Sequence, residues 1–166
     1  MILNQLTKVD ILAVGVHPDD VELSCSGTLL HHIKMGKTVG LLDLTRGELG
    51  TRGSAEIRDA EARSAAEIMG AKFRKNLEFA DGFFEYTKEN VLKIAAAVRS
   101  CQPEIVLANA LSDRHPDHGR AAKLVAEACF YSGLQKIITY GEDGAIQDRW
   151  RPAAVYHYIQ DHNLEP

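Results

Sequence analysis

The sequence predicts an α/β fold with a Rossmann-like, mostly parallel sheet and helices on both faces. Short apolar runs rich in β-branched residues alternate along the chain with segments of helical periodicity. The first run, 9–16 (VDILAVGV), is apolar except for Asp10, which is typical of a strand covered on both sides. The 166 residues contain neither an internal repeat nor a linker, and they are enough for one sizeable core. We therefore expect a single domain over residues 1–166.

The first helix is expected over 24–35, after that strand. Ser24 or Ser26 is a suitable N-cap, and Gly36 is suited to ending the helix. The expected apolar stripe of this helix consists of Leu29, Leu30 and Ile33. A second buried strand is expected over 38–44 (TVGLLDL).

The clearest helical pattern spans 54–69, with Ser54 as its N-cap and Gly70 as its stop. Spacings of three and four predict one inward face, made of Ile57, Ala60, Ser64, Ala65, Ile68 and Met69. A short strand is expected next, over 77–79.

The second half of the chain continues the alternation. Its expected elements are a helix over 88–99, a strand over 104–110, a helix over 118–130 and a last strand over 153–159. Thr87 caps the first of these helices, and Pro103 prevents its continuation. The inward faces are expected to be Val91, Leu92, Ala95 and Val98 in one helix, and Ala121, Leu124, Val125 and Ala128 in the other.

Composition excludes several classes of protein. Lys and Arg number 19 and Asp and Glu number 23, so the formal net charge of −4 argues against a dedicated nucleic-acid binder. No apolar stretch approaches the ~20 residues that cross a bilayer, and the N-terminus lacks the features of a signal peptide. The scattered Cys25, Cys101 and Cys129 indicate reduced, buried thiols. We expect a cytoplasmic protein without membrane or nucleic-acid partners.

Two similar clusters follow two of the expected strands. The sequence His17-Pro18-Asp19-Asp20 comes after 9–16, and His115-Pro116-Asp117-His118 comes after 104–110. Carboxyl ends of neighbouring parallel strands meet at one edge of a sheet, where ligands bind in such folds. Imidazole and carboxylate groups suit Zn²⁺, whose catalytic sites use three protein ligands.

The spacing of the clusters suggests how the ligands divide. His17 and Asp20 can converge from one turn, and one histidine of the second cluster would complete the set. Asp19 and the remaining histidine could then act on water and the leaving group. A single Pro-Asp cluster is ordinary turn chemistry, but two at matching places favour a shared metal site. His31, His32, His157 and His162 lack such spacing and are left outside it.

The glycine- and arginine-rich segment 45–54 (TRGELGTRGS) opens the helix at 54–69. It matches neither a Walker loop nor a dinucleotide-binding fingerprint. It is either a solvated flexible loop or a substrate wall in which Arg46, Arg52 or Arg58 holds a carboxylate or sugar hydroxyls. Arg58 is the first candidate, and we expect Phe83 and Phe84 to serve packing.

These residues carry a family resemblance. The run 13–22 (AVGVHPDDVE), the pair Gly27-Thr28 and the later HPDH run resemble the LmbE-like (PIG-L) de-N-acetylases along essentially the whole chain. Within that family, the chain looks most like the bacterial deacetylases of bacillithiol biosynthesis, which act on N-acetylglucosaminyl-malate. The resemblance implies a zinc-dependent hydrolase of a small-molecule amino-sugar conjugate.

The resemblance also implies roles for particular residues. It implies that His17, Asp20 and His118 bind Zn²⁺, which Fe²⁺ could replace. It implies that Asp19 is the general base for the metal-bound water. His115 would stabilise the tetrahedral intermediate and protonate the amine, Asp117 would orient His115, and Arg58 would lie near the substrate. Members of the family usually continue beyond the length of this chain, so we expect it to lack their C-terminal portion, which contributes to homo-oligomer contacts.

Two other functions compete with this interpretation. A metal-dependent phosphoester hydrolase could use the glycine–arginine loop, but a two-metal site needs more carboxylates than the two clusters supply. A sugar- or nucleotide-binding module with a structural metal would need four protein ligands, commonly including cysteine, and the three cysteines are remote from both clusters.

Overall fold

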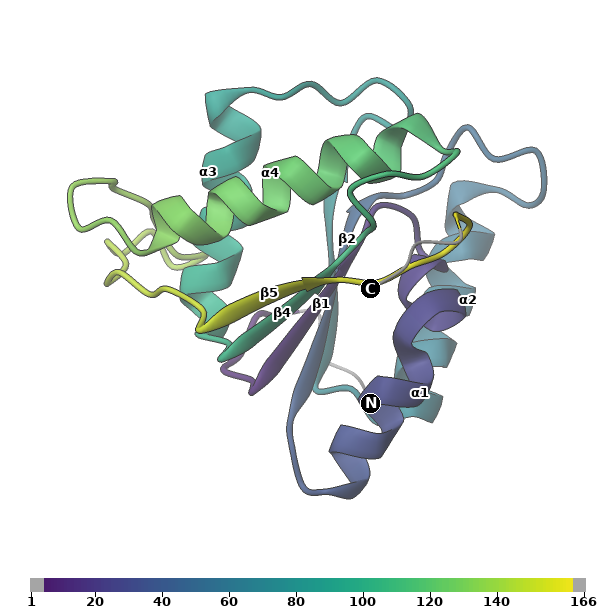
Figure 1. Ribbon diagram of the computed structural model, residues 1–166, viewed down its shortest axis with the longest axis horizontal. Helices are drawn as coiled ribbons and strands as arrows, with labels where there is room; N and C mark the ends of the chain where they lie inside the picture. Colours follow the sequence, from purple (N-terminus) through teal and green to yellow (C-terminus); the bar gives the residue numbers. More distant parts are fainter. Residues whose placement is uncertain (1–4, 163–166) are drawn as a thin grey trace.

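The computed structural model describes residues 5–162 and shows a five-stranded, all-parallel sheet in the order β3-β2-β1-β4-β5 (Figure 1). The strands are β1 (Ile11–Gly15), β2 (Val39–Thr45), β3 (Phe73–Phe79), β4 (Ile105–Ala108) and β5 (Ala154–His157). The helices are α1 (Asp20–Lys34), α2 (Ala55–Met69), α3 (Lys88–Cys101) and α4 (Pro116–Ser132). The predicted fold class is confirmed.

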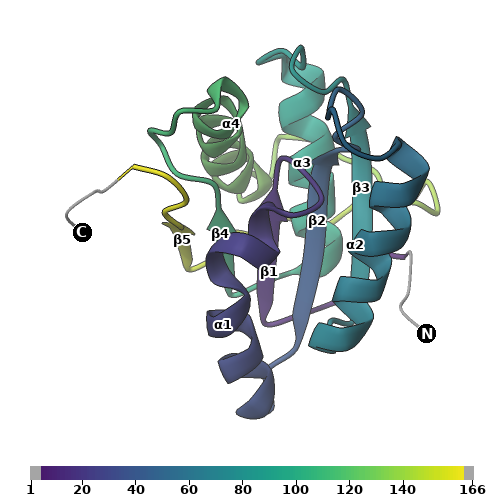
Figure 2. The same cartoon turned by 90° about the vertical axis from the view of Figure 1, so that its right-hand side faces the viewer.

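The sheet separates two helical layers. Helices α1 and α2 cover one face and α3 and α4 cover the other (Figure 2). Alternate residues of β1 enter the two cores, since Leu12 and Val14 pack toward α3 and α4 whereas Ile11 and Ala13 pack toward α1 and α2. The chain changes direction in the sheet between β1 and β4, and the helices change face with it. This switch point is where open α/β sheets bind ligands.

Several local predictions are confirmed. Ser54 accepts a hydrogen bond from Ile57 N at the start of α2, and Gly70 ends that helix in the left-handed conformation with φ 82°. Thr87 accepts from Asn90 N at the start of α3. The inward face predicted for the last helix is buried, and so are all three cysteines, whose thiol pKa values burial raises to about 12.

The beginning of the first helix was predicted wrongly. Helix α1 starts at Asp20 with Asp19 as N-cap, so Ser24 and Ser26 lie inside it. The acidic side chains of Asp20 and Glu22 in the first turn favour this earlier start because they face the positive end of the helix dipole. The predicted stripe is also only partly correct, since Leu29 is buried but Leu30 is 47% exposed.

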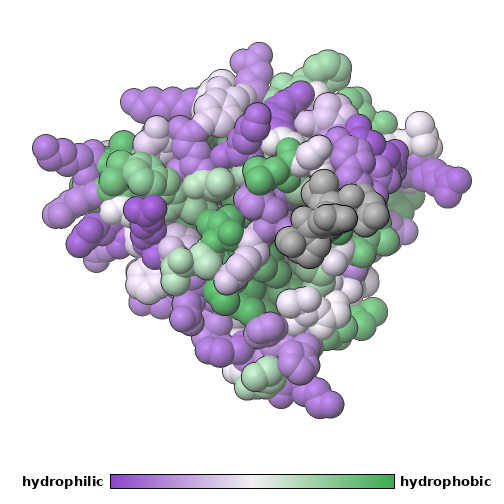
Figure 3. Space-filling model, viewed as in Figure 1, coloured by the Kyte–Doolittle hydropathy of each residue, from purple (hydrophilic) through white to green (hydrophobic). Residues whose placement is uncertain are grey.

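The predicted inward face of α2 was wrong except for Met69. Its buried residues are Ala62, Ala66 and Met69, whereas Ile57 and Ile68 are 52% and 86% exposed. Two alanines thus face the core, and the two isoleucines face away from it. The face of the molecule in Figure 3 mixes hydrophobic with hydrophilic residues, as is ordinary for folded proteins.

Strand β3 begins four residues earlier than predicted, at Phe73. The start of this strand was missed because Arg74 and Lys75 are charged and interrupt the apolar pattern. Arg74 is nevertheless buried, because the carboxylates of Asp43 and Glu22 pair with its guanidinium. After the strand, Phe84 is buried as expected, but Phe83 is 77% exposed and packs little.

Candidate active site

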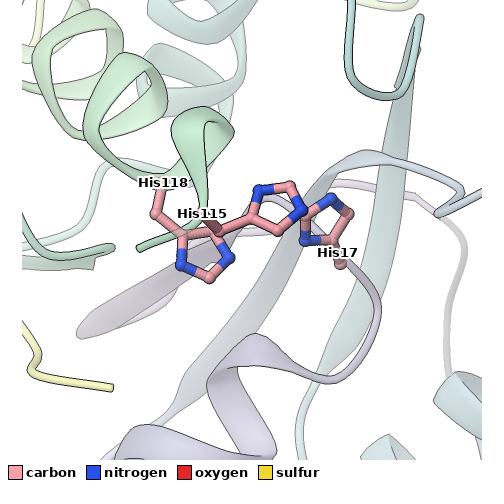
Figure 4. A group of neighbouring side chains, drawn as sticks. All are labelled: His17, His115 and His118. Carbon is pink, nitrogen blue, oxygen red and sulfur yellow. The ribbon is translucent and has the colours of Figure 1, made fainter. Parts of the chain in front are cut away.

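The two histidine clusters meet at the switch point of the sheet. His17 lies two residues beyond β1, and His115 is the N-cap of α4, with Pro116 at the first helical position. The ring centroids of His17 and His115 are 4.8 Å apart, and those of His115 and His118 are 4.9 Å apart (Figure 4). The turn after β1 is tight, because a Cβ on Gly15 would lie 3.1 Å from the Asp20 Cβ atom.

Asp20 lies buried between the clusters. Its Oδ2 accepts hydrogen bonds of 3.0 Å from the backbone N–H groups of Val16 and His17 and from Asn109 Nδ2. Its Oδ1 accepts from Gln160 Nε2 at 2.8 Å. Burial alone would raise the Asp20 pKa, but the hydrogen bonds and charges of His118 and His17 hold that pKa well below its usual range. The carboxylate therefore stays ionised at neutral pH.

His17 and His118 both face Asp20. The distance from His17 Nδ1 to Asp20 Oδ2 is 3.7 Å, and that from His118 Nε2 to Asp20 Oδ1 is 3.3 Å. Burial works to lower the pKa of each imidazole, but interactions with Asp20, supported by Asp81 for His17 and by Asp113 for His118, outweigh burial and raise both pKa values. The Asp20 carboxylate thus favours the protonated, positively charged form of both imidazole rings.

The donor atoms fit a divalent cation. One nitrogen of each of His17, His115 and His118 lies within 4.8 Å of the others, and so do ligand atoms of His17, Asp81 and Asp117. His118 Nδ1 is buried 3.1 Å from Asp113 Oδ1 but outside hydrogen-bond geometry, and Asp113 Oδ2 has no partner. Within residues 5–162, Asp20, Asp81 and Asp113 form no ion pair with lysine or arginine. Imidazoles gathered with uncompensated carboxylates are the ligands that Zn²⁺ prefers.

The residues expected to act on the substrate lie around this centre. Asp19 has a side chain that is 55% exposed, and Arg58 Nη2 donates to its Oδ2 at 3.4 Å. His115 accepts at Nδ1 from the backbone N–H of Asp117 at 3.3 Å. Burial, followed by the charges of His17 and His118, lowers the His115 pKa.

Asp117 was expected to orient His115. Its carboxylate is fully buried and points elsewhere, accepting from Gly82 N at 2.9 Å and from Arg120 Nη1 at 3.1 Å. The contact that Asp117 makes with His115 is through its main chain.

Only one of the three candidate arginines reaches the centre. Arg58 lies against the loop 46–53, where a Cβ on Gly47 or Gly50 would come within 2.7 Å of its guanidinium. Glycine at these two positions therefore lets the loop close over Arg58. Arg46 instead pairs with Asp59 on α2 at 2.5 Å, and Arg52 is exposed.

Four residues that the sequence patterns did not assign to the site lie in it. Asp81, Asn109, Asp113 and Gln160 contact His17, Asp20 or His118. Asp81 lies two residues after β3 and Asn109 directly follows β4, so their position at the carboxyl edge of the sheet was the available signal. Among the described residues, no helix is long and apolar enough to cross a membrane.

Comparison with known proteins gives one family match. The family model described as PIG-L, GlcNAc-PI de-N-acetylase, matches residues 12–129. The chain is 34% identical to the diacetylchitobiose deacetylase of Thermococcus kodakarensis over 79% of this chain and 52% of that protein. It is 28% identical to the 4-oxalmesaconate hydratase of Pseudomonas putida over 85% of this chain and 64% of that protein. A protein of Bacillus anthracis named probable N-acetyl-alpha-D-glucosaminyl L-malate deacetylase 2 is 30% identical, over 71% of this chain and 58% of its own length.

Among solved structures, a conserved protein from Thermus thermophilus superposes with a TM-score of 0.87 and 40% identity, covering 95% of this chain and 69% of that one. The chain spans about half of the length of the Thermococcus deacetylase.

Proposed function

Because the chain belongs to the PIG-L de-N-acetylase family, we propose that it is a metal-dependent hydrolase that removes the N-acetyl group from an N-acetylglucosaminyl conjugate. The observation that carries this proposal is the clustering of His17, His115 and His118 at the switch point of the sheet, where His17 and His118 both face the buried carboxylate of Asp20. The names of two relatives, which are deacetylases of amino-sugar compounds, support the same reaction class.

In this proposal His17, Asp20 and His118 hold the metal, which is Zn²⁺ with Fe²⁺ as the alternative. One imidazole comes from each histidine cluster, and both face the Asp20 carboxylate, so the three side chains can close around one ion. A bound Zn²⁺ supplies a Lewis acid that lowers the pKa of water to ~7 and polarises the acyl oxygen.

Asp19 is the proposed general base. It adjoins Asp20 in sequence but is exposed, and the one described contact of its side chain is a long one from Arg58 to Oδ2, so a carboxylate oxygen remains free to take a proton from the attacking water. His115 is the proposed acid. Its protonated form can stabilise the oxyanion and then give a proton to the departing amine. Water adds to the amide carbonyl, the C–N bond breaks, and the products are acetate and a free glucosamine amine.

The finer substrate assignment is N-acetylglucosaminyl-malate. Arg58 reaches the centre beside Asp19, and a guanidinium there suits a substrate carboxylate such as those of malate. Arg46 is engaged by Asp59 and Arg52 is exposed, so these two arginines would bind substrate only if the loop rearranges. A homo-oligomer and a cytoplasmic location stay predictions.

One similar protein is named as a hydratase and not as a deacetylase, so similarity to this chain does not by itself fix the reaction. The same residues could place water on a carbon–carbon double bond of an unsaturated acid. We favour deacetylation because the family model and the relatives of at least 30% identity quoted above name it.

The test is acetate release by the Zn²⁺-loaded chain from N-acetylglucosaminyl-malate and from diacetylchitobiose. Asp19→Asn should lower kcat by ~10²–10⁴-fold while Zn²⁺ binding is kept, because only the proton acceptor is lost. Glu89→Gln, an exposed change on α3, is the matched control and should leave kcat unchanged. Near wild-type turnover by Asp19→Asn would refute the assigned base, and hydration without acetate release would refute the deacetylase.

A further inference from the structure

Asp81 is a buried carboxylate outside the proposed metal-ligand and catalytic set. It follows β3 by two residues, and its Oδ1 lies 3.0 Å from His17 Nε2. The side chain of Asp81 is 6% exposed and that of His17 is 11% exposed, so water competes little for this contact. Asp81 makes no ion pair with lysine or arginine in the described part of the chain.

The contact determines which nitrogen of His17 carries the proton. An ionised carboxylate only accepts hydrogen bonds, so in the neutral ring Nε2 must be the donor. The lone pair is then left on Nδ1, and Nδ1 is the nitrogen that faces Asp20, at 3.7 Å. Asp81 thus holds the ring in the tautomer and orientation in which Nδ1 can bind a cation between His17, Asp20 and His118.

The same carboxylate also holds the glycine–arginine loop. Asp81 Oδ2 accepts from Leu49 N at 2.9 Å, and Asp81 N donates to Glu48 Oε1 at 2.9 Å. This reciprocal pair fastens the loop that closes over Arg58 to the turn after β3. One side chain therefore joins a candidate metal ligand to the candidate substrate loop.

A second cation among His17, Asp81 and Asp117 is the competing explanation of this cluster. The hydrogen bonds argue against it. Leu49 N donates to Asp81 and Gly82 N donates to Asp117, and His17 Nε2 directs its proton at Asp81. A cation here would have to replace that proton, and it would then share one imidazole with the ion on the other side.

We propose that Asp81 is a positioning residue that fixes His17 for metal binding through Nδ1 and couples this ligand to the loop 46–53. The inference rests on the proposed metal site. Carboxylates behind metal-binding histidines raise ligand basicity and hold the ring, and their loss costs ~10–100-fold in metal affinity.

The first measurement needs no variant. Nitrogen-15 NMR of the metal-free wild type, recorded above the raised pKa of His17, should show the Nε2–H tautomer of this ring. A ring protonated on Nδ1 would overturn the proposal. In Asp81→Ala, a larger share of the His17 rings should carry the proton on Nδ1, because Asp20 Oδ2 is then the carboxylate oxygen that faces the ring.

The second measurement is competitive titration of the full chain with Zn²⁺ against a chelator. Asp81→Asn should bind Zn²⁺ ~10–100-fold more weakly than wild type, since one of the two oxygens that accept from His17 and Leu49 becomes an NH2 group, which only donates. Glu89→Gln should match wild type. Equal affinity in Asp81→Asn and wild type, with acetate release intact, would overturn this inference alone. A wild type that binds no Zn²⁺ would overturn both this inference and the proposed function.

Discussion

Asp43 on β2 and Asp20 at the start of α1 are both buried carboxylates, but only Asp43 meets a guanidinium. Arg74 Nε and Nη2 donate to the two oxygens of Asp43 at 2.7 and 2.8 Å, and Arg74 also pairs with Glu22. Asp20 instead meets two imidazoles and the amides of Asn109 and Gln160. Asp20 and Glu22 lie two residues apart on one helix, but a guanidinium neutralises Glu22 whereas imidazoles face Asp20.

The difference separates a structural network from a binding site. Arginine is always charged and its fork saturates the carboxylate, so the Asp43–Arg74–Glu22 network is closed by the protein itself. Imidazoles keep a lone pair when neutral, so the group around Asp20 is completed either by protons or by a metal ion. Converging acids alone therefore do not identify a metal centre; the partner that neutralises them does.

The largest expected effect comes from removing the cation of the closed network. Arg74→Met leaves Asp43 and Glu22 without a partner in a buried site, and we expect it to lower the free energy of unfolding by ~3–5 kcal/mol. Urea unfolding of the metal-free chain measures this. A loss below about 1 kcal/mol would mean that Arg74 does not compensate the network.

The matched control is the double variant Arg74→Met with Asp43→Asn. It removes a buried charge together with the cation, so it should recover part of the lost stability. The Zn²⁺ affinity of the folded single and double variants should be close to that of wild type, because Arg74 does not contact His17, Asp20 or His118 in the described structure.

A pH dependence distinguishes the two carboxylates next. Burial raises the pKa of Asp43 to about 6 despite Arg74, which divides its charge between two acids, whereas the pKa of Asp20 is lowered. Above the unfolded pKa of 3.8 the folded state holds the Asp43 proton longer, so this residue's contribution to stability is present at low pH and is lost as pH rises toward about 6. The two-unit shift corresponds to at most ~3 kcal/mol.

Unfolding free energies of wild type and Asp43→Asn between about pH 4 and 6 test this shift. The difference between the two curves should change with pH across that window and be flat above it. The raised pKa values of His17 and His118 act at higher pH, since their contribution is lost only as pH rises through values above 6.5. Parallel curves for the two proteins would show that the Asp43 pKa is not raised.

The sequence supports the prediction of one of these regions much better than the other. The HPDD and HPDH clusters stand at the ends of continuous apolar strands, and a parallel sheet must bring such ends to one edge. The convergence of His17 and His118 therefore follows from chain order and strand composition. Asp81 does not, because its contact with His17 joins residues 64 apart, and a single aspartate in a turn reads as ordinary turn chemistry.

The Arg74 network was hidden for a related reason. Periodicity treats charged residues as exposed, so Arg74 shortened the predicted strand β3 although it is buried between Asp43 and Glu22. The inward face of α2 was misplaced because hydrophobicity favours isoleucine over alanine for the core. The structure instead buries Ala62 and Ala66, and which side of α2 faces the sheet depends on tertiary structure that no local pattern contains.

The smallest expected effect is the one that marks the open region as a metal site. Zn²⁺ at 100 times its Kd should raise the free energy of unfolding of wild type by ~2.7 kcal/mol, because the ion binds only the folded centre. Asp20→Asn should lose this increment, since the carboxylate between His17 and His118 becomes neutral. Arg74→Met should show the same gain in the free energy of unfolding, starting from the lower value of the metal-free variant. A chelator should remove the gain in wild type and in Arg74→Met. An equal increment in Asp20→Asn and wild type would place the ion elsewhere, and the contrast between the two carboxylate groups would then carry no information about metal binding.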